Sequence, residues 1–148
     1  MGMYTKFNVI IPLKNDIPKN IKELLYEMIE YGTTNSKDES IEHEFFNGKT
    51  RPFFARCNSY YFTGTSNSSI QYANEREKKD MVLHIDCDFK NYNNDIDLFL
   101  DFVKQFIEYT NYFPMFLGYS QYEEDANPTL YFYDGKEILK FTNQNIQE

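Results

Sequence analysis

Three side chains that could do chemistry lie at alternate positions of one short segment, His84, Asp86 and Asp88. In an extended chain alternate residues share a face, so these three would project together, away from Leu83 and Cys87. A histidine and two carboxylates can bind a divalent metal ion or act as an acid–base group. Because five strand residues extend over about 13 Å, one ion would need further ligands. The competing interpretation is the solvent-facing side of an ordinary antiparallel strand.

The rest of the chain contains no recognised catalytic pattern. It has no G-x-S-x-G, no glycine-rich phosphate loop, no H-E-x-x-H and no C-x-x-C. The second histidine, His43, lies in a polar stretch, and Cys57 and Cys87 lie in apolar stretches typical of reduced, buried thiols. We therefore expect a cytoplasmic protein without a cofactor, and we favour a non-catalytic role.

The charge balance favours a protein partner. Lysine and arginine number 15 against 23 acidic residues, which gives a net charge of −8 and a pI near 4.8. Nucleic-acid and anionic-membrane surfaces need clustered basic residues, and a membrane span needs about 20 apolar residues in a row. We expect no direct nucleic-acid or membrane contact, and a partner that is basic by charge complementarity.

Hydrophobic periodicity predicts the elements that position these residues. Helices are expected at 16–32 and 95–109, and strands at 3–11, 53–57, 60–64, 70–74, 81–89, 115–122, 129–134 and 137–141. Asp16 is the expected cap of the first helix, and Asp134-Gly135 is a hairpin signal between the last two strands. The pattern predicts a single α+β domain, 1–148, with an antiparallel sheet and two helices.

The predicted order is β-α-β-β-β twice, over 3–74 and 81–141, and short matches such as Ile29-Glu30-Tyr31 with Ile107-Glu108-Tyr109 favour an internal duplication. This tandem order is similar to that of the vicinal-oxygen-chelate (glyoxalase and bleomycin-resistance) superfamily. The resemblance implies a metal or ligand cleft between paired modules, with His84 in a strand that can carry a ligand. The first half departs from that pattern, because its opening strand has no histidine.

A second resemblance rests on short segments spread over most of the chain. They are Ser59-Tyr60-Tyr61-Phe62, Phe89-Lys90-Asn91-Tyr92, Tyr122-Glu123-Glu124 and Pro128-Thr129-Leu130-Tyr131. These segments resemble a group of small uncharacterised bacterial and phage proteins. That resemblance implies a genomic context and no mechanism.

The second predicted helix is the expected contact surface. Three large apolar residues flank its polar stripe, and acidic residues lie beside them and in the turn after 122. The candidate partner-binding residues are Leu98, Phe102, Tyr109, Asp97, Asp101, Glu123, Glu124 and Asp125. An exposed apolar patch would mark a homodimer seam or a partner site. In the alternative, the loop 33–50 with Phe45 and Phe46 covers this patch within the monomer.

Three functions stay open. The first is an acidic protein-binding or accessory module, of the immunity type or associated with a mobile element. The second is a metal- or ligand-binding enzyme of glyoxalase-like topology that uses His84. The third is an acidic mimic of nucleic acid that blocks a nucleic-acid-binding protein. Stoichiometric metal would favour the second, and a basic partner would favour the first or third.

Overall fold

The computed structural model describes residues 3–35, 37, 39–47, 51–59, 66–91, 93–109 and 113–142. Its strands are β1 (Thr5–Pro12), β2 (Ser69–Asn74), β3 (Lys79–Phe89), β4 (Met115–Tyr122), β5 (Thr129–Tyr133) and β6 (Ile138–Thr142). Its helices are α1 (Lys19–Tyr31) and α2 (Asp95–Val103). The predicted α+β class, an antiparallel sheet with two helices, is confirmed.

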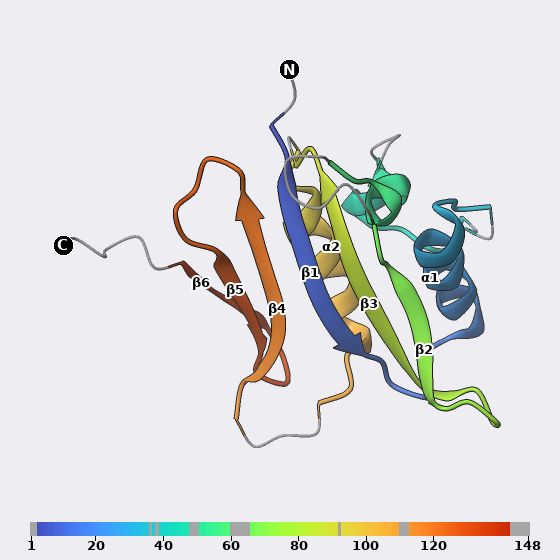
Figure 1. The fold of residues 1–148 in the computed structure, drawn as a ribbon. Coiled ribbons are helices and arrows are strands. Elements are labelled where there is room, and N and C mark those ends of the chain that lie inside the picture. Colours follow the sequence, from blue (N-terminus) through green and yellow to red (C-terminus); the bar gives the residue numbers. More distant parts are fainter. Residues whose placement is uncertain are drawn as a thin grey trace.

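The six strands form one sheet in the order β2-β3-β1-β4-β5-β6 (Figure 1). Every pair of neighbours is antiparallel. The central strand β1 pairs along its whole length with β3, from Thr5 opposite Phe89 to Pro12 opposite Val82. The sheet therefore has two edges, β2 on one side and β6 on the other.

One face of the sheet packs against the helices. Alternate residues of β1 and β3, among them Phe7, Val9 and Leu83, are fully buried. They form one hydrophobic core with the apolar sides of α1 and α2, and Figure 1 shows α2 running behind β1. Since successive strand residues point to opposite faces, the intervening side chains lie on the other face, which neither α1 nor α2 covers. We call it the open face.

The prediction of a strand at 53–57 is wrong. Residues Arg51–Arg56 form a 3₁₀ helix. Phe54 explains the difference, because its ring packs 6.2 Å from Phe7, 5.3 Å from Phe89 and 5.1 Å from Phe99. Contacts from three elements thus override the local preference of an aromatic segment for a strand. The strand predicted at 60–64 lies outside the described residues, and the internal duplication stays a prediction.

The helix boundaries differ from the predicted ones at two points. The first helix begins after Pro18 rather than at an Asp16 cap, and it makes no side-chain capping bond. The second helix ends at Val103 and tightens into a 3₁₀ turn, Lys104–Phe106. Ile107 then forms an isolated bridge with Leu13, which pulls the chain out of the helix.

The predicted hairpin at Asp134-Gly135 joins adjacent antiparallel strands, β5 and β6, so this prediction is confirmed. The Asp134 carboxylate accepts the backbone N–H groups of Lys136 and Glu137 at 2.9 and 2.7 Å. In the described part of the chain, no helix is long and apolar enough to cross a membrane.

Candidate functional site

A row of phenylalanines crosses the open face on three neighbouring strands, one from each. Phe116 of β4 lies 5.2 Å from Phe132 of β5, which lies 5.5 Å from Phe141 of β6, between ring centroids. Phe116 and Phe141 are both 54% exposed. We call Phe116, Phe132 and Phe141 the aromatic row. It brings large apolar groups together in contact with solvent, which is typical of an interaction surface.

The aromatic row ends at β6, an edge strand. β6 pairs with β5 on one side. Among the described residues, no strand and no side chain bonds to the backbone on its other side. Unpaired N–H and C=O groups at a sheet edge are a template for another strand.

At the opposite edge of the sheet, side-chain carboxylates accept backbone N–H groups of β2. The N–H of Ile70 donates to Glu30 Oε1 at 2.8 Å, and the N–H of Tyr72 donates to Glu75 Oε1 at 3.4 Å. Glu30 comes from α1, which lies beside β2 (Figure 1). The two edges of the sheet therefore differ, because carboxylates occupy donors on β2 that a further strand would need.

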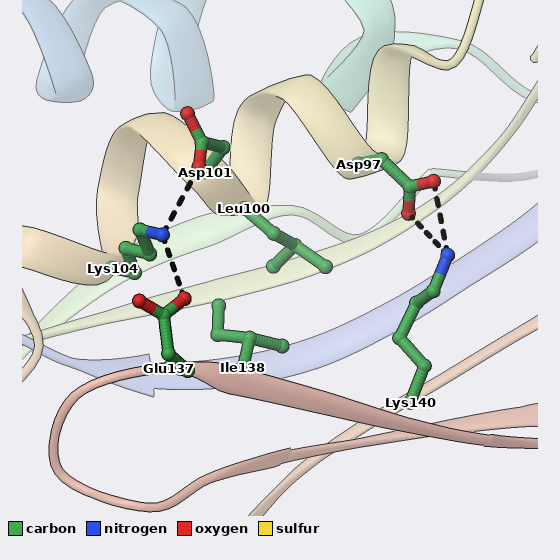
Figure 2. A pocket seen from close by; sticks show the side chains of 7 residues that line it. All are labelled: Asp97, Leu100, Asp101, Lys104, Glu137, Ile138 and Lys140. Atoms are coloured by element: carbon green, nitrogen blue, oxygen red, sulfur yellow. Dashed lines mark hydrogen bonds and ion pairs between the residues drawn. The ribbon is translucent and has the colours of Figure 1, made fainter.

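A small cleft lies between α2 and β6, on the helix side of the same edge (Figure 2). Its volume is about 180 Å³, and its lining residues are Asp97, Leu100, Asp101, Lys104, Glu137, Ile138 and Lys140. Figure 2 shows Leu100 and Ile138 between two groups of ion pairs. Two of the acidic residues predicted to bind a partner, Asp97 and Asp101, thus lie at the β6 edge.

Ion pairs join α2 to the β6 hairpin across this cleft. Lys140 Nζ lies 3.0 Å from Asp97 Oδ2, and Lys104 Nζ lies 2.8 Å from Glu137 Oε2 and 3.1 Å from Asp101 Oδ1. The bond to Glu137, followed by that to Asp101, raises the pKa of Lys104. All three carboxylates remain about half exposed, so each pair contributes little to stability. They leave negative charge accessible beside β6.

His43 has no ring nitrogen available for acid–base chemistry. Nε2 lies 2.8 Å from Asp101 Oδ2, and Nδ1 accepts the backbone N–H of Phe45 at 3.0 Å. An acceptor at Nδ1 places the proton on Nε2, which donates to the carboxylate. This bond, ahead of that from Lys104, lowers the pKa of Asp101. The arrangement fixes the segment before the 3₁₀ helix Glu44–Asn47 against α2.

The predicted faces of β3 are confirmed, because Leu83, Ile85 and Cys87 are fully buried while His84 and Asp86 are partly exposed. The three predicted metal ligands do not form a cluster. In the described ranges, no group of three or more histidine, cysteine, aspartate or glutamate side chains is placed to hold a metal ion.

The ammonium group of a lysine occupies the position at which a cation would bind the two aspartates of β3. Lys6 Nζ of β1 lies 3.0 Å from Asp86 Oδ1 and 3.7 Å from Asp88 Oδ1. The Asp88 side chain is fully buried, its Oδ2 accepts the N–H of Ser59 at 3.3 Å, and its Oδ1 has no hydrogen-bond partner. Burial raises the pKa of Asp88, and the charge of Lys6 opposes that shift.

The apolar residues predicted to form a contact on α2 are not exposed together. Phe102 is 2% exposed and packs 5.0 Å from Phe46, so the loop covers it, as in the alternative interpretation. Leu98 and Tyr109 are half-buried against the core. The Tyr109 hydroxyl also donates to the carbonyl of Phe113 at 2.9 Å. Phe102 therefore contributes to the monomer core rather than to a surface.

The acidic turn after β4 lies away from the α2–β6 cleft, at the other end of the β4–β5 hairpin from Phe116. Glu123 Oε1 accepts the N–H of Tyr4 at 2.7 Å, whereas Glu124 and Asp125 are exposed. The predicted acidic groups therefore fall into two places, this turn and the cleft.

The aromatic row was not predicted from the sequence. Alternation in 129–133 and 138–142 could have shown that Phe132 and Phe141 share a face, but their contact depends on strand pairing. Comparison with protein-family models, curated proteins and solved structures found no match to the chain. The resemblances named above stay expectations.

Proposed function

We propose that the protein is a non-catalytic binding module that docks another protein on the β6 edge surface. We define this surface as the aromatic row together with β6 and the α2–β6 cleft. The observation that carries the proposal is the aromatic row, which reaches solvent on the open face and ends at β6, whose outer side pairs with no other described strand.

The energetics favour covering this surface. Burying a large apolar side chain stabilises by roughly 1.5–3 kcal/mol, and aromatic residues are enriched in protein interfaces. Phe116 and Phe141 each retain half of their surface in solvent. A partner that covered both would gain roughly half of this free energy at each residue, without unfolding any part of the core.

Two clusters of titratable groups in the described part, around His43 and around Asp88, have structural roles, whereas His84 stays partly exposed on the open face. Both ring nitrogens of His43 are engaged. Lys6 bridges the carboxylates of β3, and the buried Asp88 is held by a backbone N–H. A general acid or base needs a proton-accepting atom within reach of a substrate. These bonds instead hold the segment around His43 against α2 and join β1 to β3.

The charge of the chain indicates the chemistry of the partner. A net charge of −8 steers association with basic proteins and repels acidic ones. Glu137 and the exposed Glu124 and Asp125 lie on the hairpins that also carry the row, and α2 adds Asp97 and Asp101 beside β6. The proposed partner is therefore basic, with an apolar contact that covers the aromatic row.

The test is affinity capture from an extract of the cells that encode the protein. The double variant Phe116→Ser with Phe141→Ser should lose a stoichiometric partner that the parent protein retains. Tyr31→Ser is the matched control, because Tyr31 is 65% exposed on α1, beside the opposite edge. Unchanged melting of each variant shows that the fold is intact. Equal recovery with parent and double variant, or recovery of no partner, would contradict the proposal.

A further inference from the structure

We infer that the partner supplies an extended segment that pairs with β6 as a seventh strand and alternates apolar with basic residues. This inference rests on the proposed function and specifies what occupies the β6 edge surface. It follows from three features of the same edge: its backbone, the side chains on its open face and the side chains on its helix face.

The backbone of β6 is available for pairing. Its five residues bond to β5 in an unbroken register, from Ile138 opposite Tyr133 to Thr142 opposite Thr129. On the other edge of the sheet, Glu30 and Glu75 accept the N–H groups of β2. Strand addition uses main-chain hydrogen bonds for affinity and alternate side chains for specificity. Of the two edges, β6 is the one that a strand can extend.

The open-face side chains of an added strand would lie beside apolar groups. Leu139 pairs with Phe132 on β5, and the Phe141 ring packs against the same phenylalanine. Side chains directly opposite one another on paired strands lie about 4.5–5.5 Å apart between Cβ atoms. Every second residue of the partner segment would thus meet Leu139 or Phe141, and an apolar residue suits that position.

The helix-face side chains of the added strand would lie at the mouth of the α2–β6 cleft. Three carboxylates line it against two lysines, and Asp97, Asp101 and Glu137 have side chains 48%, 55% and 54% exposed. Asp97 balances the charge of Lys140 at 3.0 Å, so lysine or arginine side chains entering there would meet Asp101 and Glu137 against the single charge of Lys104. The intervening residues of the segment are therefore basic.

A second copy of the chain fits this edge less well. Each copy carries a net charge of −8, so two copies repel one another. Pairing along β6 would also bring the carboxylates of both clefts to one seam. Charge complementarity thus favours a basic segment.

The experiment uses the full chain and three short labelled peptides, with binding followed by fluorescence anisotropy. One peptide alternates leucine and lysine, the second alternates leucine and glutamate, and the third contains the leucine and lysine residues of the first in a non-alternating order. We expect the first to bind at least about tenfold more tightly than the other two, and to weaken as salt is raised. Its binding should slow amide hydrogen exchange in β6 and leave β2 unchanged.

Single variants test the contributions of the open face and the helix face of β6 separately. Phe141→Ser and Asp97→Asn should each weaken binding of the leucine–lysine peptide by about tenfold or less, whereas Tyr31→Ser should not. Equal binding of the ordered and reordered peptides, protection of β2 or α1 instead of β6, or no binding would overturn the inference. A dimer of the parent protein by light scattering that Phe141→Ser dissociates would also overturn it. If a row-dependent partner is captured but the peptides do not bind, strand addition fails while the binding module stands.

Discussion

The carboxylate of Glu30 accepts the backbone N–H of Ile70 at 2.8 Å, and so joins the last turn of α1 to the edge strand β2. The bond satisfies a partly buried backbone donor at the edge of the sheet. β6 has no corresponding bond among the described residues. This difference between the two edges supports the proposal that a partner strand pairs with β6.

Replacing Glu30 with alanine should destabilise the protein by about 1–3 kcal/mol, because a partly buried N–H loses its acceptor. The amide of Ile70 should also exchange faster. Glu23→Ala is the control, since Glu23 is exposed on the same helix and its one ion pair within the described ranges is with Lys19 at 3.8 Å. Urea denaturation and hydrogen exchange measure both effects. Equal stability of the two variants would show that the carboxylate does not hold the edge.

Asp88→Asn should stabilise the protein at neutral pH. Burial raises the pKa of Asp88 in the folded state, so the protonated form is favoured by folding, and stability is lost as pH rises through the folded pKa. An amide removes this penalty and can still accept the N–H of Ser59. The gain should disappear below the unfolded pKa of about 3.9. Asp86→Asn should instead destabilise, since it removes the negative charge 3.0 Å from Lys6 Nζ.

That prediction is checked by unfolding both variants across acidic to neutral pH. An Asp88→Asn protein less stable than the parent at neutral pH would mean that the attraction of Lys6 exceeds the cost of burying the charge.

Phe102 and Phe141 should respond in opposite ways to truncation. Phe102→Ala should cost about 3–5 kcal/mol of folding stability, because Phe102 is 2% exposed and packs against Phe46 and His43. Phe141→Ala should change stability far less, since half of its surface is in solvent. Denaturant titrations of both variants test this. A large loss for Phe141→Ala would assign the aromatic row a structural role instead.

Gly118 and Gly135 should tolerate side chains to different extents. A Cβ added at Gly118, where φ is +152°, would overlap the carbonyl oxygen of Asn8 and lie 2.7 Å from Val9 Cα. At Gly135, where φ is +100°, it would lie 3.0 Å from the Tyr109 ring, which can shift. We expect Gly135→Val to cost about 1–3 kcal/mol, and Gly118→Ala to lower the melting temperature more. The reverse order would contradict the close packing of β1 and β4.

Local sequence patterns were sufficient to predict much of the fold. Strict alternation identified β1 and the faces of β3, and Asp134-Gly135 identified the last hairpin. Periodicity failed where distant contacts decide the backbone. Phe54 adopts a 3₁₀ conformation because aromatic rings from β1, β3 and α2 surround it, and none of these is near in sequence.

The candidate site was harder to predict for the same reason. The sequence identified Asp97 and Asp101 as accessible carboxylates, but it could not show that Lys140 meets Asp97, or that Glu137 meets Lys104, across the cleft. The sequence also predicted that Phe102 is exposed, whereas in the structure His43 and Phe46, from the segment 33–50, cover it. The aromatic row depends on sheet order, which is a property of the whole chain.

In the proposed function, a protein partner docks on the β6 edge surface. The most direct measurement is amide hydrogen exchange of the full chain, free and bound to the partner captured by the parent protein. We expect the partner to slow exchange in β6 and in the hairpin that joins it to β5, and to leave β2 and α1 unchanged. Protection confined to β2 or α1, with β6 exchanging as in the free protein, would contradict the claim.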